Sequence, residues 1–372
     1  KISLATFALL GLASAADESQ KCRVLAFSSG DEDAAYQAGA LKGIVNSDKL
    51  QDEDFAYDTI TGISGGALNA VMLSNYTKGE EAEAVDRMQQ FWVDATHSDL
   101  YKNWIGGVAR GLFFEGGLYN SAPLEKFLKQ EFIDVNVQRN MTMGIVDVED
   151  GLFKEFTDKN ITQGGNLIDA MYASMSFAGF FPPAEVLDTA WFDGSGVWDL
   201  DIFSGVNRCK EAGFAEKDIV VDVIMTSSAN LKEVEAEDYK SVNMLFRYLE
   251  ISSYYNSMDA LLRSQFAYKD ANFRYVITPT GEIPSSFYPL SLNETQVEDT
   301  FAMGVKDAQD VIAKGSKQSL KDLLHYYALK KSGKGSGGRT FGEFLDAKAN
   351  GELEEFSLED HALLKKYSFM TK

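Results

Sequence analysis

The chain has 372 residues, of which 45% are hydrophobic and 24% charged, so it has enough apolar side chains for a sizeable core and is not a disordered protein. Its formal net charge of -21 excludes a nucleic-acid-binding protein, because contacts with phosphates require clusters of Lys and Arg. The same charge opposes binding to anionic membranes. If the protein acts on lipids, a neutral or zwitterionic lipid or ester substrate is expected.

The first fifteen residues are typical of a secretory signal peptide. Lys1 supplies a positive end, residues 2–12 are apolar, and Ala13, Ser14 and Ala15 form a small-residue cleavage site. The sequence therefore predicts a secreted or luminal protein whose mature chain begins near Ala16. No later run of about 20 apolar residues occurs, so no transmembrane segment is expected.

The chain contains two cysteines, Cys22 and Cys209. In an oxidising compartment they are expected to form one disulfide, and the alternative is two free buried thiols. Acceptor triplets for N-glycosylation also fit the secretory route and predict a glycoprotein. They begin at Asn75, Asn140, Asn160 and Asn293.

The first predicted elements follow one another as strand, helix, strand, sharp turn and helix. Residues 23–27 are an apolar run, residues 34–44 have helical spacing, and residues 55–60 have strand character and lead into Gly62. Such alternation predicts parallel strands with helices on both faces of the sheet.

The sheet is expected to continue beyond the middle of the chain. Residues 141–148 and 152–156 predict a hairpin that turns at Asp150 and Gly151, and residues 219–225 and 273–277 predict two further strands. Residues 330–340 are rich in Gly, Ser and Lys and indicate a flexible linker. Residues 341–372 are then expected to form a polar helical tail.

The chemistry is predicted to centre on the G-x-S-x-G sequence of residues 62–66. In such an elbow, small residues (here Gly62 and Gly66) let a strand turn sharply into a helix and present the serine at the helix N-terminus. The helix dipole and the free N–H groups there stabilise a developing oxyanion. Ser64 is therefore the candidate nucleophile, and Gly65 is the expected first oxyanion donor.

The base that activates Ser64 is not expected to be a histidine. A surface role is expected for His97, His325 and His361, and the last two lie near or beyond the predicted linker in polar helical settings. The elbow also comes too early for an α/β-hydrolase, so a triad that uses His325 is the weaker alternative. A buried carboxylate can accept the proton instead. Asp193, between aromatic residues and glycines, is the candidate, and the alternative is a simple Asp-Gly turn.

Five blocks of the sequence, in order, resemble the patatin-like phospholipase family. They are residues 35–41, residues 62–66, residues 116–119 with Pro123 and Leu124, residues 173–183, and Asp193 with Gly194. The resemblance implies a three-layer α/β/α domain with a mostly parallel central sheet over residues 22–329. It also implies a catalytic dyad of Ser64 and Asp193 that needs no metal or other cofactor.

The oxyanion loop departs from the pattern of this family, which is G-G-G-x-R-G. Residues 29–34 occupy the equivalent place as S-G-D-E-D-A, so two of the leading glycines are lost and Asp33 replaces the arginine. The resemblance assigns backbone donors to Gly30 and Asp31, but acidic side chains near an oxyanion oppose its charge. Ser195 after Asp193 and Gly194 is a milder departure.

Several aromatic residues are expected either to pack in the core or to line an acyl pocket. They are Phe91, Trp92, Tyr101, Trp104, Phe113, Phe114, Phe177, Phe180 and Phe181.

Two hypotheses about function follow from these residues. The first is a lipid acyl hydrolase, that is a phospholipase, lysophospholipase or esterase, that works through an acyl-enzyme on Ser64. The second is an inactive patatin fold retained for a storage, structural or assembly role, in which case a protein partner is expected.

Overall fold

A computed structural model describes residues 21–164, 166–227, 231, 234–235, 237, 239–284, 290–291, 293–331 and 339–353. The predicted signal peptide, most of the predicted linker and His361 lie outside these residues. The strands are β1 (Cys22–Phe27), β2 (Thr59–Ile63), β3 (Asn140–Asp147), β4 (Phe153–Thr157), β5 (Ala184–Val186), β6 (Thr189–Asp193), β7 (Ile219–Ile224) and β8 (Asn272–Ile277).

Helices connect these strands and follow the last of them. The α-helices are α1 (Ala34–Val45), α2 (Asp52–Phe55), α3 (Gly65–Ser74), α4 (Glu81–Thr96), α5 (Gly107–Phe114), α6 (Ala122–Glu131), α7 (Asp158–Gly164), α8 (Leu167–Ser174), α9 (Ile202–Glu211), α10 (Ser241–Ala267), α11 (Glu294–Lys314), α12 (Gln318–Lys331) and α13 (Phe341–Ala349). Short 3₁₀ turns are η1 (Asp31–Asp33), η2 (Gly194–Gly196) and η3 (Glu216–Asp218). None of the described helices is long and apolar enough to cross a membrane.

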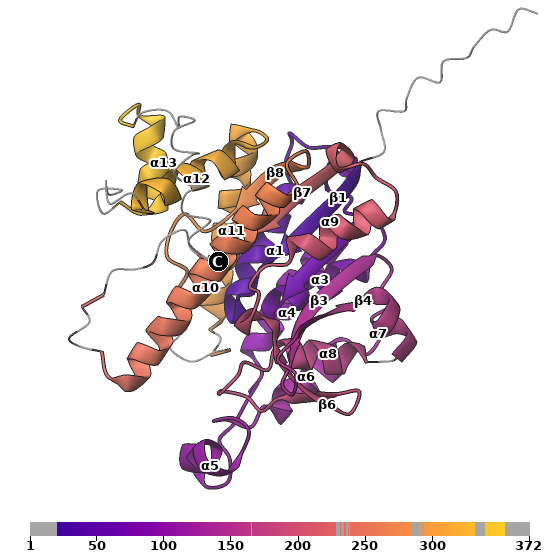
Figure 1. Cartoon of the computed structure of the whole chain (residues 1–372), viewed down its shortest axis with the longest axis vertical. Helices are drawn as coiled ribbons and strands as arrows, with labels where there is room; N and C mark the ends of the chain where they lie inside the picture. Colours follow the sequence, from indigo (N-terminus) through magenta and orange to yellow (C-terminus); the bar gives the residue numbers. More distant parts are fainter. Residues whose placement is uncertain are drawn as a thin grey trace, which may run out of the picture.

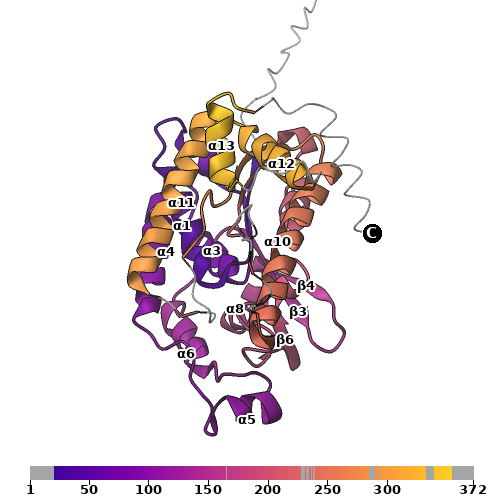
Figure 2. The ribbon, with the colours of Figure 1, turned by 90° about the vertical axis from the view of Figure 1, so that its left-hand side faces the viewer.

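The strands form one sheet in the order β5-β6-β3-β2-β1-β7-β8, with β4 paired to β3. The pairs from β3 through β2, β1 and β7 to β8 are parallel, whereas β4, β5 and β6 add antiparallel pairs at the other side. Helices cover both faces, as Figure 2 shows with the sheet between α1, α4 and α11 on one side and α10 and α12 on the other. The expected three-layer α/β/α class with a mostly parallel sheet is confirmed.

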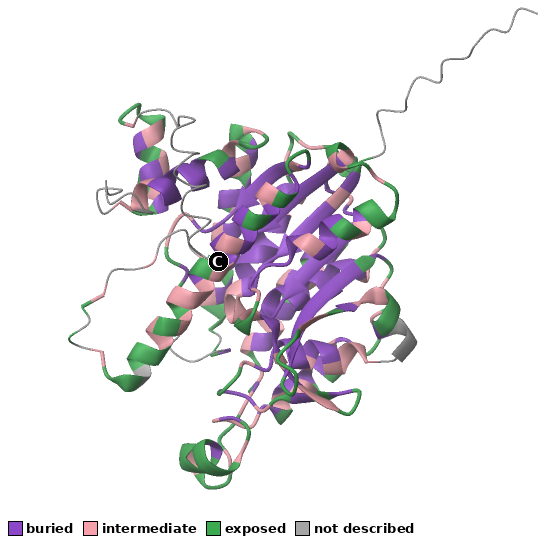
Figure 3. Cartoon of the chain, viewed as in Figure 1, coloured by how far each residue is buried: buried purple, intermediate pink, exposed green. Residues whose placement is uncertain are grey.

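Alternation along β1 shows why the sheet has two buried faces. Leu25 and Phe27 pack into the core that contains α1, α3 and α4, whereas Val24 and Ala26 pack into the core that contains α9, α10 and α12. Successive side chains of a strand point to opposite faces, so a strand that is apolar at every position must be covered on both. Figure 3 accordingly shows the central strands buried.

Most predicted elements occur where the sequence placed them. The hairpin is confirmed as β3 and β4 with Gly151 at a φ of 71°, and the two later strands are β7 and β8. The strand predicted from residue 55 is wrong at its start, because residues 52–55 form the short helix α2 and β2 begins at Thr59. Phe55 is buried in the core from that helix.

The described part of the C-terminal tail packs on the domain. In α13 both Phe341 and Phe344 are buried, and they pack with Tyr326 of α12. The Gly342 N–H also donates to the Thr280 carbonyl at 3.0 Å. Residues 354–372 lie outside the described residues.

The predicted disulfide is confirmed. Cys22 at the start of β1 and Cys209 in α9 are bonded, with their Cα atoms 5.8 Å apart, across a sequence separation of 187 residues. Both residues are buried in the core between β1 and α9. The bond therefore holds the first strand of the domain to a helix from the middle of the chain.

Removal of this bond is expected to destabilise the fold. The double variant Cys22→Ala, Cys209→Ala should lose about 2–5 kcal/mol of unfolding free energy, because the bond restricts a long loop of the unfolded chain. Denaturant unfolding monitored by circular dichroism measures the loss. Wild type unfolded with a reductant should show the same loss, and an unchanged midpoint in both samples would contradict the prediction.

Candidate active site

Ser64 lies in the turn between β2 and α3. Its φ of 54° and ψ of -129° are unusual for a residue with a side chain, and such strain, of order 1–3 kcal/mol, is typical of functional sites. The Ser64 N–H donates to the Ser174 Oγ at 2.9 Å, which helps to hold this conformation. The side chain stands at the N-terminus of α3, where the first N–H groups have no acceptor within the helix.

Two glycines let the loop after β1 lie directly on this elbow. A Cβ atom on Gly66 would be 2.2 Å from the Ser28 carbonyl oxygen, and one on Gly65 would be 2.5 Å from the Asp31 carbonyl oxygen. Both distances are too short for any side chain. The loop of residues 28–31 and the start of α3 therefore pack backbone against backbone.

Buried polar side chains hold the loop in this place. Gln37 Nε2 donates to the Ser28 carbonyl at 2.7 Å, and Asn69 Nδ2 donates to Gln37 Oε1 at 2.9 Å. Trp92 Nε1 in turn donates to Asn69 Oδ1 at 3.0 Å, so α1, α3 and α4 are joined to the loop. A satisfied network of this kind fixes the position of each group in it.

The register of the sheet brings Asp193 to the same place. Ile63 pairs with Gly144 of β3, and the next residue, Ile145, pairs with Asp193 at the end of β6. Asp193 is therefore two strands from the elbow, roughly 10 Å between backbones, a span that two facing side chains can close. The Asp193 N–H donates to the Ser176 carbonyl at 3.1 Å, close to the Ser174 that holds Ser64.

The Asp193 carboxyl is buried and only half satisfied. Its Oδ1 accepts a hydrogen bond of 2.9 Å from the Ser195 N–H, whereas its Oδ2 has no partner of good geometry among the described residues. Burial, followed by the charge of Asp31, raises the pKa of Asp193 to about 8. Hydrogen bonds from Ser195 and from the Ser64 hydroxyl lower this pKa but do not offset the rise. Ser64 and Asp193, which come from distant parts of the sequence, thus lie in one buried site.

Asp31 contributes a second carboxyl to the site. The Ser64 Oγ donates to Asp31 Oδ1 at 3.4 Å, which is a weak hydrogen bond. Burial raises the pKa of Asp31 to about 6, with the Ser64 hydrogen bond lowering it and the charge of Asp199 adding to the rise. The sequence indicated that the acidic side chains of this loop oppose an oxyanion, but it did not predict a hydrogen bond between the Asp31 carboxyl and Ser64.

A third acid, Asp199, lies behind the loop. Its carboxyl accepts hydrogen bonds from Ser257, Ser29 and Ser253, the last at 3.1 Å, and its backbone carbonyl accepts one of 2.8 Å from Ser29 N–H. Burial raises the pKa of Asp199 despite these bonds. The sequence analysis missed both Asp199 and Ser174, because only the fold brings these ordinary residues to Ser64.

Among the described residues, no cation forms an ion pair with the buried carboxyls of the site. In the described ranges, no ion pair reaches Asp31, Asp193 or Asp199. Burial, followed by the charges of Glu32 and Asp31, also raises the pKa of Asp33 well above its ordinary value. Within those ranges, no three His, Cys, Asp or Glu residues are arranged to hold a metal ion.

The nine aromatic residues divide into three groups. Phe91 and Trp92 are core residues of α4, and Phe113 and Phe114 are exposed on α5. The others line the segment of residues 177–181 or lie near it, with ring contacts of 5.4 Å between Tyr101 and Phe181 and 5.5 Å between Phe177 and Phe180. That segment follows Ser174 and Ser176, and two of its rings, Phe180 and Phe181, are also buried in the core.

The two described histidines, His97 and His325, lie apart from this arrangement. His325, on α12, contacts the edge of the Phe344 ring with centroids 5.2 Å apart. His97 follows α4 and is exposed, with its Nε2 atom 3.8 Å from Glu294 Oε2. Neither residue makes a contact with Ser64 in the described structure, which disfavours the triad that uses His325.

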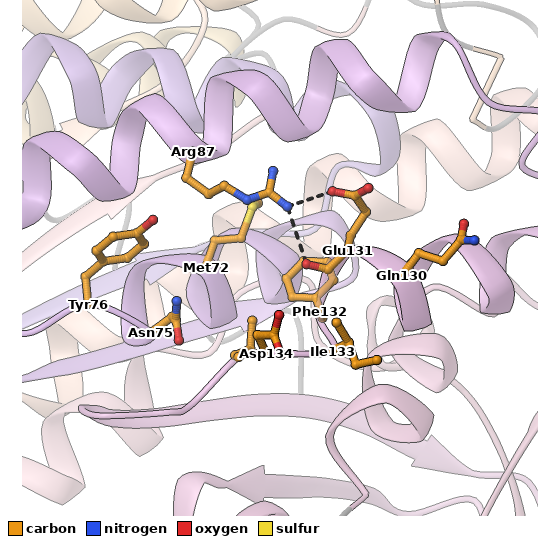
Figure 4. A pocket seen from close by; sticks show the side chains of 10 residues that line it. Met72, Asn75, Tyr76, Arg87, Gln130, Glu131, Phe132, Ile133 and Asp134 are labelled. Carbon is orange, nitrogen blue, oxygen red and sulfur yellow. Dashed lines mark hydrogen bonds and ion pairs between the residues drawn. The ribbon is translucent and has the colours of Figure 1, made fainter.

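A small pocket lies at the far end of α3 from Ser64. It is lined by Met72, Asn75, Tyr76 and residues of α4, α6 and the loop after α6 (Figure 4). Arg87 donates to Glu131 Oε2 there at 2.7 Å. Because α3 spans ten residues, about 15 Å separates this pocket from the elbow, and it is no substrate site for Ser64.

The chain is thus an α/β protein with a serine elbow at the carboxyl end of a mostly parallel sheet and a buried aspartate beside it. Residues 25–199 match the family model for patatin-like phospholipase, and this part of the chain belongs to that family. A solved structure, that of VipD from Legionella pneumophila, is similar with a TM-score of 0.39 and 11% identity over 80% of this chain and 67% of VipD. Among the curated proteins no match was found.

The contact between the loop and the elbow predicts a sharp effect of a single methyl group. Gly66→Ala should destabilise the protein by about 1–3 kcal/mol, because the new Cβ would overlap the Ser28 carbonyl. Thermal unfolding measures this loss. Gly281→Ala is the matched control, since its Cβ would meet nothing within 4 Å, and equal stability of the two variants would contradict the prediction.

Proposed function

We propose that the protein is a lipid acyl hydrolase in which Ser64 is the nucleophile and Asp193 the base. The observation that carries this proposal is the strained serine of the elbow beside a buried carboxyl whose Oδ2 lacks a hydrogen bond. The membership of residues 25–199 in the patatin-like phospholipases supports an ester of a fatty acid as the substrate.

In the proposed reaction, Asp193 Oδ2 accepts the hydroxyl proton while Ser64 Oγ attacks the ester carbonyl. The N–H of Gly65 and those of Gly30 and Asp31 in the loop are the proposed donors to the oxyanion. Collapse of the intermediate releases the alcohol, which takes the proton from Asp193. A water molecule then gives a proton to Asp193 and attacks the acyl-enzyme. As the fatty acid is released, Asp193 returns this proton to Ser64 Oγ, which restores the free enzyme.

The Asp31 carboxyl supports the second hypothesis, an inactive fold. Its weak hydrogen bond to the Ser64 hydroxyl competes with the interaction between Ser64 and Asp193. An ionised carboxyl there also opposes the negative charge of the oxyanion. The two hypotheses therefore differ in whether Ser64 reaches Asp193 when an ester is bound.

Substitution of the dyad tests the proposal. Wild type should hydrolyse a short-chain p-nitrophenyl ester and lysophosphatidylcholine, and Ser64→Ala and Asp193→Asn should each reduce kcat/KM on the order of 1000-fold or more. Release of p-nitrophenol and of fatty acid measures the two reactions. His325→Ala should retain activity per folded molecule. If wild type matches the blank, the inactive fold is the correct hypothesis.

The pH dependence should report the coupling of the two carboxyls. Asp193 must be ionised to accept a proton, so kcat/KM for the p-nitrophenyl ester should rise as the pH increases through about 8 and fall below it. Asp31→Asn removes a charge that raises this pKa, so the rise should move to lower pH.

Asp33→Asn is the control for this experiment, because Asp33 lies in the same loop but does not contribute to the pKa of Asp193. Its profile should match that of wild type. An Asp31→Asn profile that stays in place would contradict the assignment of Asp193 as the base.

We also propose the secretory route and glycosylation for this protein. The buried Cys22–Cys209 bond supports an oxidising compartment. The acceptor residues Asn140, Asn160 and Asn293 are exposed, as attachment of a glycan requires.

A further inference from the structure

The helix α5 is the most exposed apolar element in the described part of the chain. It projects from the body of the molecule in both views (Figures 1 and 2). We call residues 103–119 the α5 arm. Its tip exposes Ile105 at 94%, Phe114 at 81% and Phe113 at 72% of their surface, and Leu112 and Val108 are exposed beside them. Large side chains gathered at a projecting tip mark an interaction site.

The base of the arm is held firmly. Lys102 and Asn120 exchange two backbone hydrogen bonds of 3.0 and 2.9 Å, and Trp104 Nε1 donates to the Gly117 carbonyl at 3.0 Å. The tip lacks such anchorage, since the one buried residue of α5 is Gly111. The apolar side chains of the tip are thus presented on a fixed support, with no core of their own.

The arm is joined to the candidate active site through one segment. Leu118 N–H and Tyr119 N–H donate to the carbonyls of Gly179 and Phe180, at 3.0 and 2.9 Å. Ser174, three residues before this segment, accepts the hydrogen bond from Ser64 N–H. The base of the arm is therefore bonded to the stretch of chain that also supports the elbow.

A second apolar region flanks this segment. Phe246 of α10 contacts Phe180 with ring centroids 5.2 Å apart, and its neighbours Met244, Leu245 and Tyr248 are exposed. Figure 1 shows α5 and the start of α10 at the same end of the molecule. The exposed apolar groups thus occur on both sides of the segment that leads to Ser64.

The charge of the arm distinguishes it from the rest of the protein. Its two charged residues, Arg110 and Glu115, pair with each other at 2.6 Å, so the arm is neutral in a chain with a net charge of -21. An anionic bilayer would repel the acidic body, whereas a zwitterionic surface would not. Apolar side chains on a narrow tip suit a deformable lipid phase, because a protein partner would need a matching cavity.

We propose that the α5 arm docks the protein on zwitterionic phospholipid bilayers by inserting the side chains of Leu112, Phe113 and Phe114 among the lipids. Docking would bring the elbow to lipids in the bilayer, so the inference deepens the proposed function while resting on separate residues. Membrane binding can be measured without catalysis, and failure of one proposal leaves the other testable.

The experiment is flotation of the Ser64→Ala protein with phosphatidylcholine vesicles, in which no hydrolysis alters the lipid. The protein should float with the vesicles, and the further substitutions Phe113→Ser and Phe114→Ser should reduce the bound fraction at least 10-fold. Binding should persist in 0.5 M salt, because insertion of apolar groups is not screened. Ile133→Ser, an exposed apolar residue at the small pocket behind α3, is the matched control and should bind like its parent.

Three results would overturn the inference. They are the absence of flotation of the Ser64→Ala protein, equal binding by the arm variant and its parent, and binding that requires anionic lipid. A dimer that forms in solution and is abolished by the arm substitutions, without vesicle binding, would assign the arm to self-association instead. In the otherwise wild-type protein, the arm variant should retain the hydrolysis of the soluble p-nitrophenyl ester, which shows that its fold and site are intact.

Discussion

The backbone contact between the loop after β1 and the first turn of α3 is the constraint on which the site depends. Gly65 and Gly66 allow the carbonyls of Asp31 and Ser28 to approach closer than any Cβ atom would permit. This approach places the backbone of the loop beside the Ser64 hydroxyl and buries the elbow. The polar network from Gln37 through Asn69 to Trp92 then fixes the loop from behind.

The electrostatics of the site follow from the same burial. Asp31, Asp193 and Asp199 lie in one region with no cation paired to them in the described structure, so the ionisation of each opposes that of the next. The protons of such coupled groups belong to the cluster more than to one residue. The charge state of Asp31 therefore influences both the Asp193 carboxyl and the Ser64 hydroxyl.

The segment of residues 174–181 connects parts of the molecule that are far apart in the sequence. Ser174 holds the backbone of Ser64, and Ser176 holds that of Asp193. Gly179 and Phe180 hold the base of the α5 arm. One short stretch thus connects Ser64, Asp193 and the base of the α5 arm, so the proposed lipid contact has a fixed position relative to the candidate active site.

The sequence by itself determined the α/β class, the strands from 23–27 to 273–277, the elbow at Ser64, the candidate Asp193 and the disulfide. These depend on local patterns, because apolar periodicity, glycine in sharp turns and cysteine pairing are visible along the chain. The same patterns did not separate the core rings Phe91 and Trp92 from the exposed Phe113 and Phe114, since all four are simply aromatic. Only the tertiary structure decided that the Asp31 carboxyl meets Ser64, that Ser174 supports the elbow and that α5 projects from the surface. These facts depend on strand register and on contacts between distant segments, and no local preference of the chain specifies such contacts.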